Sequence, residues 1–103
     1  MIRIPLTDGT GRWFDAEKAE EWDEDSNWDG NNHISVATGS QWSHETLHRT
    51  VGGRWIVHSF SNWSGSVDQF DEITDEAAAA WLVLNGHESH EACAEEFAAL
   101  EIK

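Results

Sequence analysis

The amino-acid sequence predicts an α+β fold, in which an antiparallel sheet of three to four strands packs with about three helices. In the middle of the chain, two runs rich in β-branched and aromatic residues flank Gly52-Gly53, a pattern typical of a hairpin. Further on, "AAAAWLVL" lies between Thr74, a fair helix N-cap, and Asn85-Gly86, a C-cap pattern. With 103 residues, the chain is expected to form one domain, residues 1–103, with one modest core.

The first third of the chain is expected to contain short strands and a helix. "MIRIPL" alternates apolar side chains, "TDGTG" is a turn pattern, and "RWFD" suggests a second brief strand. Asp15 can then cap a helix from Ala16 to Glu24, with Ala19 and Trp22 on its apolar stripe. Residues 26–32 have the composition of a turn.

The remaining elements give the expected order β-α-β-β-β-α-α. "HISVAT", "WSHETLHRTV" and "RWIVHSFSNW" are the three strands of the middle. A two-residue turn at Gly52-Gly53 would place Leu47 opposite His58. After the alanine-rich helix, Ser89 is expected to cap a last helix, whose apolar positions are Cys93, Phe97 and Leu100.

Charge is the strongest signal in the composition. Twenty Asp and Glu face six Lys and Arg, giving a formal net charge of −14, and only Glu45 of the acids lies between residues 31 and 67. Such a field repels nucleic acid and anionic membranes and attracts basic partners. Solubility or adaptation to high salt would explain the same charge.

Acids of the expected helices are the candidate partner-binding residues. Carboxylates one helical turn, or about 5.4 Å, apart resemble the phosphates of a nucleic-acid strand and can occupy the basic groove of a protein that binds DNA or RNA. A solvated helix face is the alternative. The candidates are Glu17, Glu20, Glu21, Glu24, Asp75, Glu76, Glu88, Glu91 and Glu95.

Seven tryptophans are unusually many for a chain of this length. In a small domain they more often build the core, and alternation favours the core for Trp55. Trp42 and Trp63 have polar neighbours in the sequence and are the candidates for a surface patch. Exposed on a sheet, they would form a stacking platform of the kind that carbohydrate-binding modules use.

Metal sites are not expected. Asp25, Asn27, Asp29 and Gly30 begin like an EF-hand loop, but its twelfth position is Val36, which offers no ligand, so the segment is expected to be a turn. In the expected register His44 and His48 share one strand face and His58 lies on the other. The segment "HETLH" has the letters of the zinc motif H-E-x-x-H, but that motif binds zinc on a helix and the segment is expected to be a strand.

Catalytic motifs are also missing, so we expect a protein that is not an enzyme and has no cofactor. The chain has no G-x-S-x-G elbow and no glycine-rich phosphate loop, and Cys93 falls on an apolar stripe, where a buried, inert thiol is expected. That cysteine is the only one, and no apolar run approaches the roughly 18 residues of a membrane span. No secretory signal is visible at the start, and the cytoplasm is the expected location.

Three segments, "WDGNNHIS", "TGSQW" and "GRW", resemble a group of small bacterial proteins that are often carried on mobile elements and have no established activity. The resemblance covers about the middle third of the chain and implies a phage- or plasmid-borne accessory protein. Size, charge and missing catalytic motifs are similar to those of anti-restriction and anti-CRISPR inhibitors.

The expected function is therefore that of a non-enzymatic DNA mimic, an inhibitor that binds the basic surface of a nucleic-acid-handling protein. A small ligand-binding module with a Trp-lined sheet, and an antitoxin or immunity protein for a basic toxin, are the alternatives.

Overall fold

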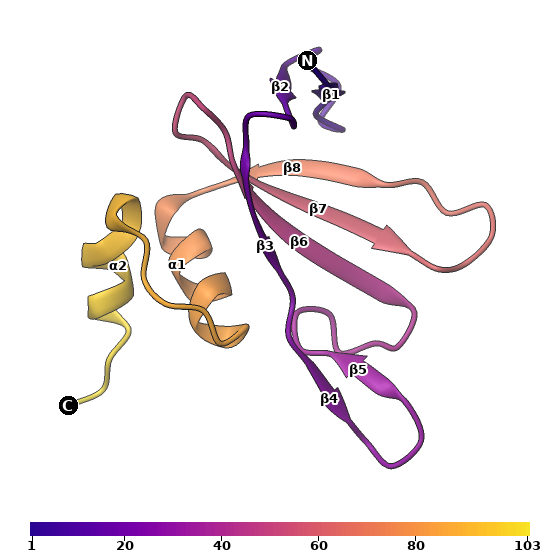
Figure 1. Cartoon of the computed structure of the whole chain (residues 1–103), viewed down its shortest axis with the longest axis vertical. Coiled ribbons are helices and arrows are strands. Elements are labelled where there is room, and N and C mark those ends of the chain that lie inside the picture. The colour runs from indigo at the N-terminus through magenta and orange to yellow at the C-terminus, as the bar shows by residue number, and fades with distance from the viewer.

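A four-stranded antiparallel sheet with the strand order β3-β6-β7-β8 forms the centre of the molecule (Figure 1). The computed structural model describes all residues, 1–103. Two further pairs of strands, β1-β2 and β4-β5, form separate small hairpins. The elements are β1 (Arg3–Pro5), β2 (Trp13–Asp15), β3 (Glu20–Asp23), β4 (Ser26–Trp28), β5 (His33–Ser35), β6 (Ser43–Arg49), β7 (Trp55–Ser61), β8 (Gln69–Ile73), α1 (Asp75–Leu84), a 3₁₀ turn η1 (Glu91–Cys93) and α2 (Ala94–Ala99).

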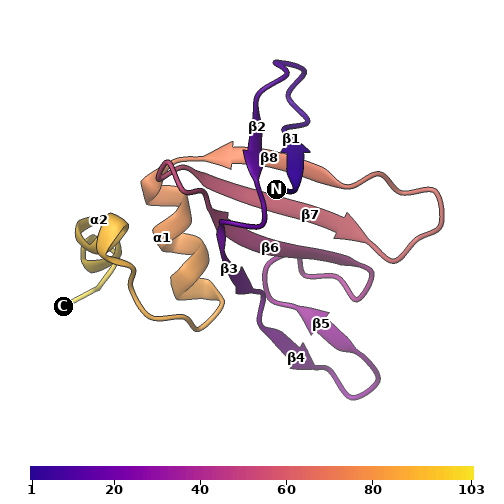
Figure 2. The same ribbon diagram turned by 45° about the horizontal axis from the view of Figure 1, so that its top comes forward.

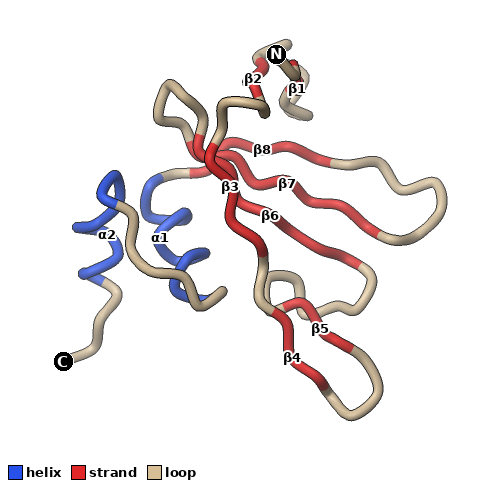
Figure 3. Tube along the Cα trace, viewed as in Figure 1, coloured by secondary structure: helices blue, strands red, loops and turns tan.

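The two faces of the central sheet are covered differently. Helix α1 packs on one face and α2 lies beside α1, as Figures 1 and 3 show. The main core lies between sheet and helix and is made of Leu47, Trp55, Ala78, Ala79, Trp81, Leu82 and Cys93. The β1-β2 hairpin lies beside β8 (Figure 2). It adds a smaller cluster of Leu6, Phe14 and Ile56, in which Ile56 belongs to the sheet face opposite the main core.

The predicted mixture of helices and antiparallel strands is confirmed, but the chain has eight strands and two α-helices instead of about three helices. The helix predicted from Ala16 to Glu24 is wrong. The segment forms a turn followed by strand β3, which pairs with β6. Trp22 stands opposite Leu47, and its ring packs against that of Trp55 with centroids 5.5 Å apart. This burial of a large aromatic ring on the sheet outweighs the weak helix preference of an acidic segment with few apolar residues.

The hairpin around Gly52-Gly53 is confirmed, but the expected register is shifted by one residue. Thr50 N donates to the carbonyl of Arg54 at 2.8 Å, so three residues lie in the loop, and Gly53 takes a positive φ of 86°. Glycine adopts this geometry without steric cost, which favours the longer loop. Leu47 therefore faces Val57, and Thr46 faces His58.

Besides β3, two further strands were not predicted, namely β4 and β8. Residues 26–28 form β4 instead of part of a turn, and the true turn spans Asp29 to Asn32, where the Asp29 carboxylate accepts from two backbone N–H groups. Strand β8 pairs with β7 through the acidic segment "QFDEI". Aspartate and glutamate have low strand propensity, so this segment is a strand because it pairs with β7.

The helix boundaries agree with the sequence at α1 and differ at α2. Thr74 caps α1 by accepting from Ala77 N at 3.1 Å, and the helix ends at Asn85 and Gly86 as expected. The last helix does not begin at Ser89, because His90 caps the 3₁₀ turn η1 and α2 starts only at Ala94.

The molecule is flat, with extents of 41 × 40 × 21 Å. No helix combines the length and the apolar character needed to cross a bilayer.

Candidate functional site

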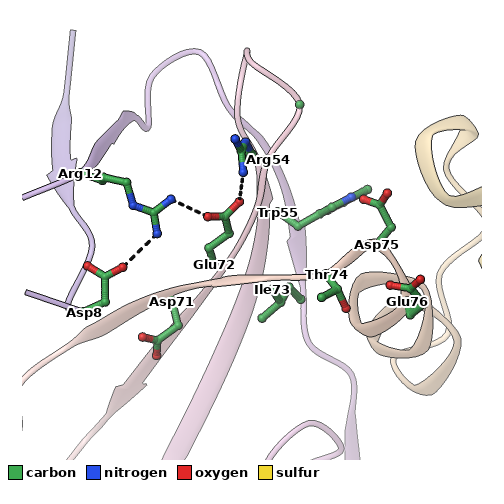
Figure 4. A pocket seen from close by; sticks show the side chains of 11 residues that line it. Asp8, Arg12, Arg54, Trp55, Asp71, Glu72, Ile73, Thr74, Asp75 and Glu76 are labelled. Carbon is green, nitrogen blue, oxygen red and sulfur yellow. Dashed lines mark hydrogen bonds and ion pairs between the residues drawn. The ribbon is translucent and has the colours of Figure 1, made fainter. Parts of the chain in front are cut away.

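An open groove of about 710 Å³ lies where β8 meets the start of α1, the β6-β7 turn and the β1-β2 turn (Figure 4). Only two of its 11 lining residues are hydrophobic, so its chemistry is that of charged groups. It is lined by Asp8, Arg12, Gly53, Arg54, Trp55, Asp71, Glu72, Ile73, Thr74, Asp75 and Glu76, and is called the acidic groove below.

On one side of the acidic groove, the two arginines are neutralised by carboxylates. Glu72 accepts from Arg12 Nη1 at 2.7 Å and from Arg54 Nη1 at 2.8 Å, and Arg12 also contacts Asp8 at 3.0 Å (Figure 4). The hydrogen bond from Arg12, followed by that from Arg54, lowers the pKa of Glu72. Hydrogen bonds from Thr10 and then Arg12 lower the pKa of Asp8 to about 2. Both acids are therefore ionised at neutral pH.

On the other side, three carboxylates have no partner within the protein. Asp71 is contributed by β8, and Asp75 and Glu76 come from the first turn of α1, where negative charge stabilises the helix dipole. All three residues are exposed and form neither a salt bridge nor a hydrogen bond. The acidic groove thus presents free negative charge beside a neutralised pair of arginines.

The floor of the acidic groove contains a buried donor without an acceptor. Trp55 is 1% exposed, and its indole Nε1 has no hydrogen-bond partner. In Figure 4 the indole points toward Asp75. A buried donor left unpaired costs about 1–3 kcal/mol, and its burial keeps this N–H out of reach of a ligand in the groove.

The other predicted partner-binding acids lie in different settings. Glu17 contacts the N-terminal amine at 2.7 Å, and Glu20 lies 3.4 Å from His90. Glu21 is exposed and without a partner. Because residues 16–24 are not helical, these side chains do not form the expected row of carboxylates.

Glu24 is a structural residue instead of a surface acid. Its carboxylate accepts from Ser35 Oγ at 2.7 Å and from the backbone N–H of Glu45 at 2.6 Å, and it bonds to His44 Nδ1 at 2.7 Å. The Glu24 side chain is only 15% exposed. It joins the end of β5 to the start of β6, and three of its roughly four acceptor positions are occupied within the protein.

The acids near the C-terminus are exposed and unpaired, as expected, but they do not share one helix. Glu88 lies in the loop before η1, Glu91 begins η1, and Glu95 lies in α2. The predicted row with one-turn spacing is therefore wrong, because the helix starts too late in the chain to hold all three. The negative charge at this end of the molecule is nevertheless uncompensated.

Trp42 and Trp63, the predicted alternative surface patch, are exposed and in contact. Their exposed fractions are 44% and 61%, and their ring centroids lie 5.0 Å apart. Trp55, in contrast, is buried as alternation indicated. The structure does not bring the Trp42-Trp63 pair into the acidic groove, because the pair lies at the opposite end of β6 and β7 from the Gly52-Gly53 turn.

The register shift places His44, His48 and His58 on one sheet face, which corrects the expected separation of His58. No three His, Cys, Asp or Glu side chains nevertheless lie close enough together to hold one metal ion.

Of the EF-hand-like segment, Asn27 is in β4 and pairs with Ile34. Cys93 is buried, and burial raises the pKa of its thiol.

We expect His48 to make folding stability depend on pH. Burial lowers its pKa below the ordinary value of 6.5, with the charge of Glu21 opposing the shift. The unfolded chain then takes up a proton at a higher pH than the folded chain does. Stability should therefore be fully present above that ordinary value and be lost as the pH falls toward the folded-state pKa. In His48→Gln, urea unfolding between about pH 7 and pH 5 should show a smaller loss than the parent chain, and an equal loss would contradict the assignment.

Comparison of the chain with protein-family models, with curated proteins and with solved structures gave no match. The resemblance to small mobile-element proteins therefore stays a prediction. What the structure defines is a flat α+β chain with an acidic groove at one end of its sheet and an exposed tryptophan pair at the other.

Proposed function

We propose that the protein is a non-enzymatic inhibitor that binds the basic surface of a nucleic-acid-handling protein through its acidic groove. The observation that carries the proposal is the set of three free carboxylates, Asp71, Asp75 and Glu76, beside arginines that are already neutralised. A lysine or arginine side chain of a partner meets unbalanced negative charge there. Arg49, whose guanidinium lies 5.5 Å from the centroid of the Trp55 ring, is the nearby cation of this chain that no carboxylate neutralises.

The shape of the molecule supports a binding role beyond solubility. Its accessible surface is 6732 Å², whereas a compact monomer of 11.6 kDa is expected to expose about 5,800 Å². The excess of roughly 900 Å² is similar to the area of about 800 Å² that each partner contributes to a standard interface. Acids that served solubility alone would not require such an open surface.

Phosphate mimicry in this protein does not rest on helical rows of glutamate. The carboxylates of the acidic groove come from a strand and from the first turn of a helix, so their positions are fixed by the β8-α1 junction. Glu88, Glu91 and Glu95 extend the negative surface outside the groove and would steer a basic partner from a distance. The nucleic-acid-handling character of the partner rests on this charge pattern and on the predicted resemblance.

The test compares two triple variants that each remove three of the negative charges. Asp71→Asn with Asp75→Asn and Glu76→Gln should weaken binding of a captured partner by about 1–3 kcal/mol, or roughly 5- to 150-fold in Kd, because each exposed ion pair contributes about 0.2–1 kcal/mol. Glu88→Gln with Glu91→Gln and Glu95→Gln is the matched control and should mainly slow association. Titration calorimetry at low and high salt measures both.

Two outcomes would contradict the proposal. If both triple variants bind as the parent chain does at either salt concentration, the carboxylates serve solubility. If only the control triple loses affinity, the binding surface is η1 and α2 instead of the acidic groove.

A further inference from the structure

The sheet face without helices carries a row of aromatic rings that the proposed function does not use. Trp42, just before β6, and Trp63, shortly after β7, pack against each other. The rings of His44 and Phe60 follow, with centroids 5.5 Å apart, and His58 comes next at 4.9 Å from Phe60. The ring of Phe70 stacks on His58 at 4.2 Å with an interplanar angle of 10°. The cross-strand pairs of β6, β7 and β8 place His44, Phe60, His58 and Phe70 on one face. These four rings, together with the tryptophan pair, are called the aromatic row.

Exposure of the tryptophan pair has no explanation in the fold. Indole rings of this size normally supply core area, as Trp55 and Trp81 do here. Trp42 and Trp63 instead leave 44% and 61% of their surface in solvent. Two such rings in contact form an apolar platform on an otherwise polar surface.

A fixed chain of hydrogen bonds ends beside this platform. Asn62 N donates to the carbonyl of Trp42 at 3.0 Å, and Asn62 Nδ2 lies 3.2 Å from His44 Nε2. Glu24 holds His44 Nδ1 at 2.7 Å and is itself held by Ser35, which is 1% exposed. The Glu24 carboxylate requires the proton on Nδ1, so Nε2 accepts from the amide of Asn62.

This arrangement leaves Asn62 with free hydrogen-bonding groups. Its amide oxygen and its second N–H have no partner in the protein, and the residue is exposed. The amide is oriented by His44 in advance, which lowers the entropic cost of binding a ligand there. An acceptor and a donor thus stand next to two exposed indole rings.

The carboxylates in contact with the aromatic row are hydrogen-bonded to its histidines. Its two bonded carboxylates are those of Glu24, on His44, and of Asp68, which lies 2.9 Å from His58 Nε2. None of the six lysines and arginines lies in residues 55–70 or 38–46. An anionic ligand would find no cation here, and a cationic one would find these two carboxylates engaged.

We propose that Trp42, Trp63 and Asn62 form a binding site for a neutral saccharide. A sugar ring presents apolar C–H faces that stack on indole and a rim of hydroxyls that bond to an amide. The pair offers two indole rings, each of which can stack on one sugar ring, so the site takes an oligosaccharide in preference to a single sugar. This site is independent of the acidic groove, which lies at the other end of β6 and β7.

The test titrates the protein with neutral oligosaccharides of glucose, xylose and N-acetylglucosamine of increasing length, followed by tryptophan fluorescence and calorimetry. At least one series should bind saturably, with affinity rising with chain length. Trp63→Ala and Asn62→Ala should each lose at least tenfold in affinity. Trp28→Ala is the matched control, because Trp28 is also 61% exposed but makes an edge contact with His33 in the β4-β5 hairpin, and this variant should bind like the parent chain.

Circular dichroism and thermal unfolding of each variant establish that it is folded, and Asn62→Ala tests the site without disturbing the packed rings. The proposal is overturned if no series binds, or if Trp28→Ala loses as much affinity as Trp63→Ala. It is also overturned if tetramethylammonium binds in a Trp63-dependent manner while every saccharide fails, because the pair is then a cation site. The triple variant that neutralises Asp71, Asp75 and Glu76 should bind saccharide with the affinity of the parent chain. This inference and the proposed function can therefore fail independently of each other.

Discussion

Leu47→Ala is expected to lower the free energy of unfolding by about 2–5 kcal/mol. Leu47 is fully buried between sheet and helix, where it faces Val57 across the strand pair and belongs to the main core cluster. Removal of its side chain loses hydrophobic transfer energy and leaves a cavity that the sheet and α1 can only partly fill. Chains of this size have a net stability of roughly 5–15 kcal/mol, so the loss is a large fraction of the whole.

Urea unfolding followed by tryptophan fluorescence measures this loss through the shift in midpoint at constant slope. Val67→Ala is the control, because Val67 is 82% exposed and should change stability by less than about 0.5 kcal/mol. Equal stabilities of the two variants would mean that the core does not lie between this sheet and α1.

Glu24→Ala is expected to cost about 2–4 kcal/mol, although Glu24 has the sequence context of a surface acid. The change removes the acceptor for Ser35 Oγ, for the Glu45 N–H and for His44 Nδ1, all of which are partly buried. Buried donors left without a partner each cost about 1–3 kcal/mol, partly offset here by water at the exposed edge. Glu21→Ala, at an exposed residue without a partner, is the matched control.

Thermal and urea unfolding of the two glutamate variants give the comparison, and His44 NMR signals report the loss of its carboxylate partner. If Glu24→Ala unfolds at the same midpoint as Glu21→Ala, then the three hydrogen bonds are not formed in solution. The orientation of Asn62 beside the tryptophan pair would then also lose its support.

The sequence predicted correctly those elements whose ends depend on a capping or turn residue close by in the chain. Thr74 and Asn85-Gly86 mark α1 because capping satisfies backbone groups within a few residues of the helix end. The Gly52-Gly53 pair located the hairpin, but not its register. Register depended on Gly53 taking a positive φ in a three-residue loop, and two adjacent glycines allow either loop length.

The prediction for residues 16–24 was wrong because their apolar pattern fits both the helical and the strand period. The spacing of Ala16, Ala19 and Trp22 suits a helix, whereas the alternation of Glu21 and Trp22 suits a strand. Only the contact of Trp22 with Trp55 selects the strand. Such a contact joins residues far apart in the sequence. The same limit applies to Glu24, whose donors Ser35 and His44 lie 11 and 20 positions away.

For the candidate site, the sequence supplied the charge and part of the residues. Asp75 and Glu76 were predicted, because acids in the first turn of a well-capped helix stay exposed. Asp71 was missed together with β8, although the alternation of Phe70 with Asp71 was a signal that a strand was present. Neutralisation of Arg12 and Arg54 by Glu72 could not be predicted, because it joins the β1-β2 turn, the β6-β7 turn and β8.

The central claim is that positive charge of a partner is taken up at the acidic groove, and NMR titration with a lysine homopeptide tests it most directly. Backbone amide shifts should change most at residues 71–76 and 53–54, and the changes should weaken with salt because screening acts beyond about 8 Å at physiological ionic strength. A serine homopeptide should give no changes, and the Asp71, Asp75 and Glu76 neutralised variant should lose them. Shift changes spread evenly over all acidic segments, or concentrated at residues 88–96, would contradict the account.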